Sequence, residues 1–115
     1  MATYTCTLNL SPTKLSIATS WSSNTPDPKE FETGDEIVFT SSVGDWRVEF
    51  IDSPFDSTTV PRTFSAPVNE SRGSELIRGR ENPAFPFDCI IVVDGQTIGW
   101  NGGGDDIRVK PGGGG

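Results

Sequence analysis

Short runs in which apolar and polar residues alternate dominate the chain. In residues 3–10 the even-numbered side chains are apolar and those between them are Thr or Asn, which is the period-2 pattern of a strand with one buried face. Residues 14–21 repeat the pattern and place Leu15 and Ile17, followed by Thr19 and Trp21, on the inward side. Pro12 lies between the two runs and predicts a bend.

Three further runs predict strands. Residues 36–40 and 46–51 flank a polar turn that contains Gly44, so we expect them to form a hairpin. Residues 87–93 give the strongest pattern, because the odd-numbered residues are apolar and Ile90 and Val92 make the second face apolar as well. This favours a central strand that is covered on both sides. Residues 107–109 predict a closing strand.

The segment 52–86 differs from the rest of the chain, because it is rich in proline and small polar residues and shows little alternation. It is longer than most loops, so it should contain some structure or serve a function. Within it, residues 70–80 can form one or two helical turns, limited by Gly73 and Gly79. We expect three phenylalanines to attach the segment to the body of the domain: Phe55, Phe64 and Phe85.

About seven short strands separated by turn residues predict an all-β fold, a Greek-key antiparallel β-sandwich with one long loop that can hold a short helical turn. The length of 115 residues suits one domain. We assign residues 1–111 to this sandwich and residues 112–115 to a flexible glycine tail.

Composition excludes several functions. The chain has 9 Lys+Arg against 16 Asp+Glu, a formal net charge of -7, which argues against a nucleic-acid partner. It contains no histidine, so catalytic sites and metal sites built on His are ruled out, and we expect no cofactor and no metal. The longest apolar run, residues 89–93, is far shorter than the ~20 residues of a membrane helix. With no signal sequence visible, we expect a cytoplasmic protein with no membrane partner.

Two cysteines, Cys6 and Cys89, lie on different predicted strands. Their spacing does not form a CxxC motif, which favours two buried thiols that behave as small apolar residues. A disulfide between the first strand and a late strand is the alternative, and redox or metal chemistry is a third.

Charged and aromatic residues give a candidate surface for a protein partner. Arg72, Arg78 and Arg80 form a basic cluster with glutamates interleaved, which favours a solvated face over a site for an anionic partner. Trp100 lies near a strand end, where an aromatic side chain can anchor a contact. The candidate partner-binding residues are Phe55, Arg72, Arg78, Arg80, Trp100, Gly114 and Gly115.

Gly114 and Gly115 belong to that set because a terminal Gly-Gly after an extended strand is how ubiquitin-like modifiers present a carboxylate for activation. The chain lacks the helix that a ubiquitin roll requires, so a flexible end or a linker is the favoured interpretation of the tail.

Three stretches resemble the cupredoxin-like sandwich: residues 34–39 (GDEIVF), 45–50 (DWRVEF) and 87–95 (FDCIIVVDG). The resemblance runs from residue 34 to residue 109. It implies the fold but not the copper chemistry, because Trp46 and Ile91 occupy the positions at which blue-copper members have a His and the Cys ligand. Met1 is the only methionine and no His exists, so a His₂Cys copper centre cannot be assembled.

These features predict a non-catalytic, copper-free cupredoxin-like module that binds a protein partner or self-assembles, with segments 52–86 and 95–106 as its contact surfaces. The alternative is a small modifier that is conjugated through its Gly-Gly tail. We disfavour an enzyme, because no nucleophile–base pair is recognisable.

Overall fold

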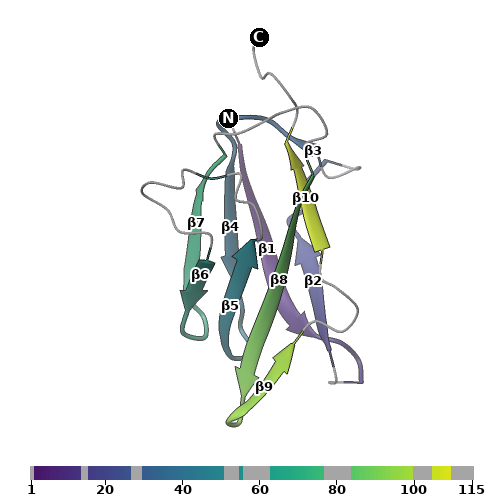
Figure 1. Ribbon diagram of the computed structural model, residues 1–115, viewed down its shortest axis with the longest axis vertical. Helices are drawn as coiled ribbons and strands as arrows, with labels where there is room; N and C mark the ends of the chain where they lie inside the picture. Colours follow the sequence, from purple (N-terminus) through teal and green to yellow (C-terminus); the bar gives the residue numbers. More distant parts are fainter. Residues whose placement is uncertain are drawn as a thin grey trace.

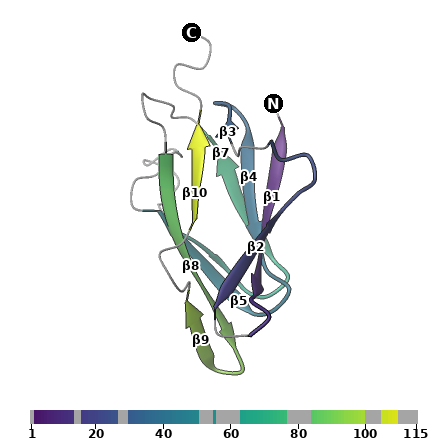
Figure 2. The ribbon, with the colours of Figure 1, turned by 90° about the vertical axis from the view of Figure 1, so that its right-hand side faces the viewer.

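Two β-sheets lie face to face in the computed structural model, with the buried side chains between them (Figures 1 and 2). The structure describes residues 2–13, 16–26, 30–50, 55, 63–76, 84–99 and 105–109. In these residues it has no helix and ten strands, which confirms the predicted β-sandwich. The strands are β1 (Thr3–Leu10), β2 (Ile17–Trp21), β3 (Glu30–Phe31), β4 (Glu36–Thr40), β5 (Asp45–Phe50), β6 (Thr63–Ala66), β7 (Ser71–Glu75), β8 (Ala84–Val93), β9 (Gln96–Gly99) and β10 (Asp105–Val109).

The strand order differs from a purely antiparallel sandwich. Sheet A has the order β2-β1-β4-β7, and sheet B has the order β3-β10-β8-β5-β6 with β9 paired to β8. Two pairs are parallel, β1 with β4 and β3 with β10. In sheet A, β1 lies between its antiparallel partner β2 and β4, so β4 pairs along the other edge of β1 and runs in the same direction as β1. Alternation within a strand carries no information about that direction, so the antiparallel prediction was wrong for these pairs.

The predicted hairpin of residues 36–40 and 46–51 is also wrong, because β4 belongs to sheet A and β5 to sheet B. Residues 41–44 form the corner between the layers. The Ser41 hydroxyl is buried and donates to the Leu8 carbonyl oxygen at 2.8 Å. A side chain at Gly44 would collide with the carbonyl oxygen of Val92. The polar turn therefore crosses between the two sheets and is held in place by the Ser41 hydroxyl. The alternation of apolar and polar residues does not reveal this contact.

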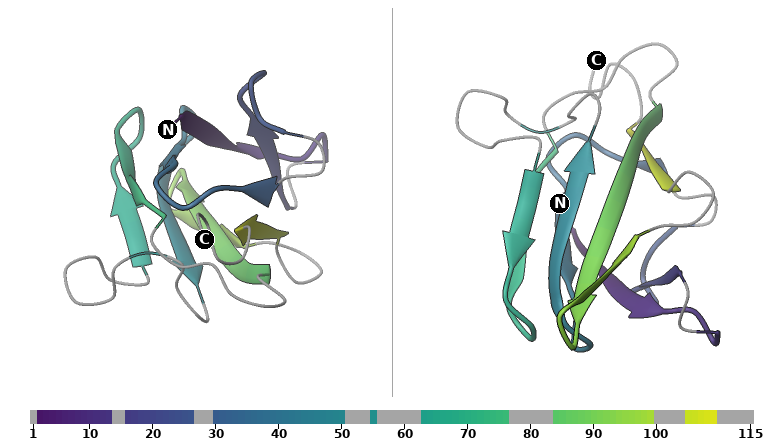
Figure 3. Two further views of the ribbon diagram at one scale, coloured as in Figure 1. Left: turned by 90° about the horizontal axis from the view of Figure 1, so that it is seen from above. Right: turned by 60° about the horizontal axis from the view of Figure 1, so that its bottom comes forward.

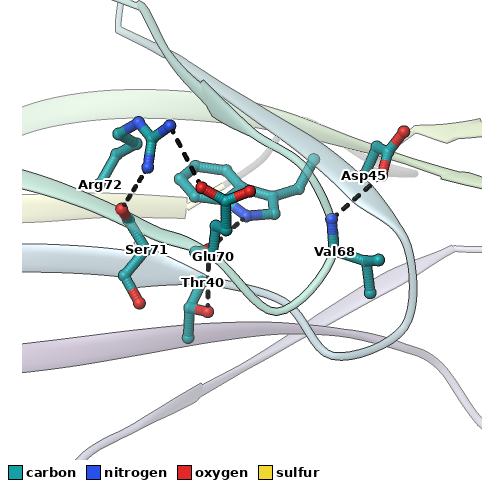
Figure 4. Close-up of polar contacts among 7 residues, drawn as sticks. Thr40, Asp45, Val68, Glu70, Ser71 and Arg72 are labelled. Atoms are coloured by element: carbon teal, nitrogen blue, oxygen red, sulfur yellow. Dashed lines mark hydrogen bonds and ion pairs between the residues drawn. The ribbon is translucent and has the colours of Figure 1, made fainter.

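Segment 52–86 contains β6 and β7, and the helical turn predicted within residues 70–80 is replaced by the strand β7 as far as Glu75. The β7 sequence, SRGSE, has no apolar residue to reveal a strand. Its pairing with β4 fixes its backbone, and the residue before it is anchored twice. The Glu70 carbonyl oxygen accepts from Trp46 Nε1 at 3.0 Å and from the Thr40 hydroxyl at 3.1 Å (Figure 4). Tertiary hydrogen bonds therefore override the weak local preference for helix.

The core is aromatic and joins the two sheets. Phe39 of sheet A lies within 6.1 Å, centroid to centroid, of three phenylalanines of sheet B: Phe50, Phe64 and Phe87. Phe55 packs on two of the same rings and is fully buried. Phe64 and Phe85 are buried as well, which confirms that phenylalanines attach segment 52–86 to the body. A chain with only 33% apolar residues thus builds its core from large rings.

Candidate functional site

The two positions at which the cupredoxin-like resemblance would place copper ligands face each other in sheet B. Trp46 of β5 and Ile91 of β8 are direct cross-strand partners. Their side chains are 2% and 0% exposed, and the Trp46 indole donates its hydrogen to the Glu70 carbonyl oxygen. This position is therefore packed core. In the described part of the chain, no group of three or more His, Cys, Asp or Glu side chains is placed to hold a metal ion.

Cys6 on β1 and Cys89 on β8 come from opposite sheets, and both are buried. Neither forms a disulfide bond. Of the three interpretations left open by the sequence, the structure therefore has two buried thiols that belong to the core cluster.

Two of the predicted partner-binding residues lie in the described part of the chain, in different environments. Phe55 is fully buried between Phe50 and Phe64, so its ring has a role in the core and offers no surface to a partner. Arg72 lies on the edge strand β7 with its side chain 48% exposed, and its guanidinium pairs with Glu70 at 3.6 Å and donates to the Ser71 carbonyl oxygen at 2.8 Å (Figure 4). The other predicted residues, Arg78, Arg80, Trp100, Gly114 and Gly115, lie outside the described residues.

In sheet B, β8 pairs with β5 and with β9 (Figure 3). A shallow groove lies over these strands on the outer face of the sheet. The buried residues of β5 and β8 point to the core, so the residues between them point outward. The groove has a volume of about 320 Å³. Its lining residues are Arg47, Glu49, Asp88, Cys89, Ile90 and Gly99.

One row of the groove is charged. Glu49 on β5 is the direct cross-strand partner of Asp88 on β8, and like charges in that position repel each other. Glu49 is compensated, because its Oε2 accepts from Arg47 at 2.9 Å and from the Thr63 hydroxyl at 3.5 Å. For Asp88, the structure shows one hydrogen bond, from the backbone N–H of Cys89 at 3.2 Å. Among the described lining residues, the groove thus carries two carboxylates, those of Glu49 and Asp88, against one guanidinium, that of Arg47.

The next row of the groove is apolar and open. Ile90 stands between Arg47 on one side and Gly99 on the other. A Cβ atom built on Gly99 would have its nearest contact at Ile90 Cγ2, 4.0 Å away. Because Gly99 has no side chain and no other described atom lies closer to that Cβ position, the described residues leave a hollow beside Ile90.

The sequence pattern did not predict this groove, although one of its signals was visible. Ile90 and Val92 predicted a second covered face of the strand, but both side chains are only half-buried on the outside of the sandwich. The prediction of a central strand is correct, since β8 lies between β10 and β5. The prediction that both of its faces are covered is wrong, because no second layer of described residues buries the outer one.

Comparisons with protein-family models, with curated proteins and with solved structures give no match in any of the three. In the segments that the structure describes, no helix has the length and hydropathy needed to cross a bilayer. A function must therefore be inferred from the geometry and chemistry of the sandwich itself.

Proposed function

We propose that the chain is a non-catalytic, copper-free sandwich of the cupredoxin-like type that binds a protein partner through the outer face of sheet B. The observation that carries this proposal is the open groove over β5, β8 and β9, in which Ile90 lies beside charged groups. A groove that joins an aliphatic side chain to charged groups on a rigid scaffold offers both apolar and polar contacts to a partner.

The placement of the groove agrees with the contact surfaces expected from the sequence. Gly99 belongs to segment 95–106, and Thr63, which borders the groove through Glu49, belongs to segment 52–86. Both segments therefore contribute to one face of sheet B. This supports a single binding face over two separate contact loops.

The cupredoxin-like part of the proposal is supported by the pairing of Trp46 with Ile91. Residues that bind one metal ion must lie close together, and the alignment that equates these two residues with copper ligands places them directly opposite each other. An indole and an aliphatic side chain at these positions serve packing, which fits a member of this fold that has no copper chemistry.

The non-catalytic part of the proposal is supported by composition. The whole chain lacks histidine, and the carboxylate of Glu49 is engaged by an ion pair with Arg47. Asp88 and Glu49 provide negative charge at the groove, and the thiol of Cys89, the nucleophilic group among the described lining residues, is 2% exposed and belongs to the core. Recognition of a charged partner suits this arrangement better than acid–base chemistry.

The experiment that tests the proposal is site-specific photo-crosslinking in the source cells. Benzoylphenylalanine is placed at Ile90, in the groove, or at Val38, a half-buried aliphatic residue on the outer face of sheet A. We expect a protein adduct from position 90 and none from position 38. Equal labelling from both positions, or no adduct from position 90, would contradict a binding face on sheet B.

A further inference from the structure

The two ends of the groove differ in chemistry, and the difference indicates which kind of group fits. One end is the open apolar hollow of Ile90 and Gly99. The other end holds the carboxylates of Glu49 and Asp88, whose backbones are directly opposite in adjacent strands. Side chains at such positions have Cβ atoms roughly 5 Å apart. A cation placed between them would interact with both carboxylates.

From this arrangement we propose that the groove binds a lysine side chain of a protein partner, with its aliphatic stem over Ile90 and Gly99 and its ammonium group between Glu49 and Asp88. This inference rests on the proposed function and names the chemistry of the partner. A lysine matches both ends, because it has an apolar stem and a compact cationic head with three donors.

The charges of the groove favour a cation over an anion. Arg47 is the one positive residue among the lining residues that the structure describes, and Glu49 already accepts its hydrogen bond at 2.9 Å. Asp88 has no cationic partner among the residues that the structure describes, so the excess charge is negative. The whole chain is negatively charged as well, with a formal net charge of -7, and this charge would steer a basic partner toward the protein.

Sheet A provides an internal control for this argument. Its outer face also pairs two carboxylates, Glu36 on β4 with Glu75 on β7, and the next outward pair is Val38 with Gly73. A side chain at Gly73 would collide with the Ile37 carbonyl oxygen and come within 2.9 Å of Val38 Cγ2. The space beside Val38 is thus already filled, so the acid pair of sheet A lacks the hollow that would hold an aliphatic stem.

The test uses three peptides that differ at one residue: acetyl-Ala-Ala-Lys-Ala-Ala-amide and its norleucine and glutamate counterparts. Binding to the full chain is followed by two-dimensional amide NMR. We expect the lysine peptide to shift the amide signals of Asp88, Cys89, Ile90 and Gly99 in a saturable manner. The norleucine and glutamate peptides should bind more weakly. Added salt should weaken binding of the lysine peptide and leave binding of the other two peptides unchanged.

Four variants sharpen the result. Glu49→Gln and Asp88→Asn should each weaken lysine binding about two- to five-fold, the range of single exposed ion pairs. Glu75→Gln removes a carboxylate from sheet A and should leave binding unchanged. Gly99→Leu fills the hollow and should abolish binding, while unchanged amide signals elsewhere in the spectrum report an intact fold.

The outcomes separate this inference from the proposed function. If the norleucine or glutamate peptide binds as tightly as the lysine peptide, the lysine assignment is overturned, but a binding face on sheet B remains. If no peptide shifts the groove signals, the lysine assignment is overturned as well. Crosslinking from Ile90 then decides independently whether this face binds a protein.

Discussion

The outer faces of the two sheets share a cross-strand pattern but differ in its packing. On sheet A, the acid pair Glu36–Glu75 lies beside Val38 and Gly73. On sheet B, the acid pair Glu49–Asp88 lies beside Ile90 and its partner Gly99. Gly73 packs against the backbone of β4, whereas a Cβ at Gly99 would have its nearest contact among the described residues at Ile90 Cγ2, 4.0 Å away. The same residue types therefore close one surface and leave a groove on the other.

The difference follows from the place of each glycine in its sheet. β7 is an edge strand paired only with β4 in sheet A, and its backbone lies so close to β4 that a glycine is required. β9 pairs with the end of β8 as a separate short strand, beyond the part of β8 that pairs with β10. A glycine on a sheet face therefore allows close approach of two strands in one context and leaves a hollow in another.

The largest expected effect comes from removing the aromatic contact that joins the two sheets across the core. Phe39→Ala removes the ring that contacts Phe50, Phe64 and Phe87 across the sheets. We expect the free energy of unfolding to fall by about 3–5 kcal/mol, as measured by urea denaturation. The exposed substitution Thr33→Ala is the control. A loss as small as that of the control would show that the sheets are joined by other contacts.

A smaller effect distinguishes the two glycines directly. Gly73→Ala forces a methyl group against the Ile37 carbonyl oxygen, so the free energy of unfolding should fall by about 1–3 kcal/mol. Gly99→Ala places its methyl group at an ordinary van der Waals distance of 4.0 Å from Ile90 Cγ2, so stability should change by less than about 0.5 kcal/mol. Both values are read from parallel denaturation curves. Equal losses would mean that the groove is not open beside Ile90.

The smallest effect concerns the acid pair of the groove. Asp88→Asn removes the repulsion with Glu49 and keeps an oxygen that can accept from the Cys89 N–H, so stability should rise by up to about 0.5 kcal/mol. The same substitution should weaken binding of the lysine peptide to the groove. Gain of stability with loss of binding would identify a carboxylate that serves recognition. A loss of stability would assign Asp88 a structural role instead.

Much of the fold was predictable because strand alternation reports burial. The inward residues of β1 and β8, such as Cys6, Leu8, Cys89 and Ile91, are buried as the pattern predicts. β7 was not predictable, since its side chains are polar and its pairing with β4 involves the backbone. The misplaced hairpin at Ser41 has a similar cause, because a polar turn looks the same whether it joins two strands of one sheet or crosses between sheets.

The individual residues of the candidate site were visible in the sequence, but their arrangement was not. Ile90 on the second face of β8 was visible in the sequence, as were the charges of Arg47, Glu49 and Asp88. Their combination depends on strand register, which places Glu49 opposite Asp88 and Gly99 opposite Ile90. Register is set by pairing between segments far apart in the chain, so no local pattern could show that these residues line one groove.

The sequence by itself determined an all-β sandwich with an aromatic core and excluded His-based chemistry, because burial and composition are properties of individual residues and their neighbours in the chain. The tertiary structure alone decided the parallel pairs, the crossing at Ser41 and the groove beside Gly99. These features depend on which strands meet and in what register, and that choice is made by contacts between distant segments and not by any one of them.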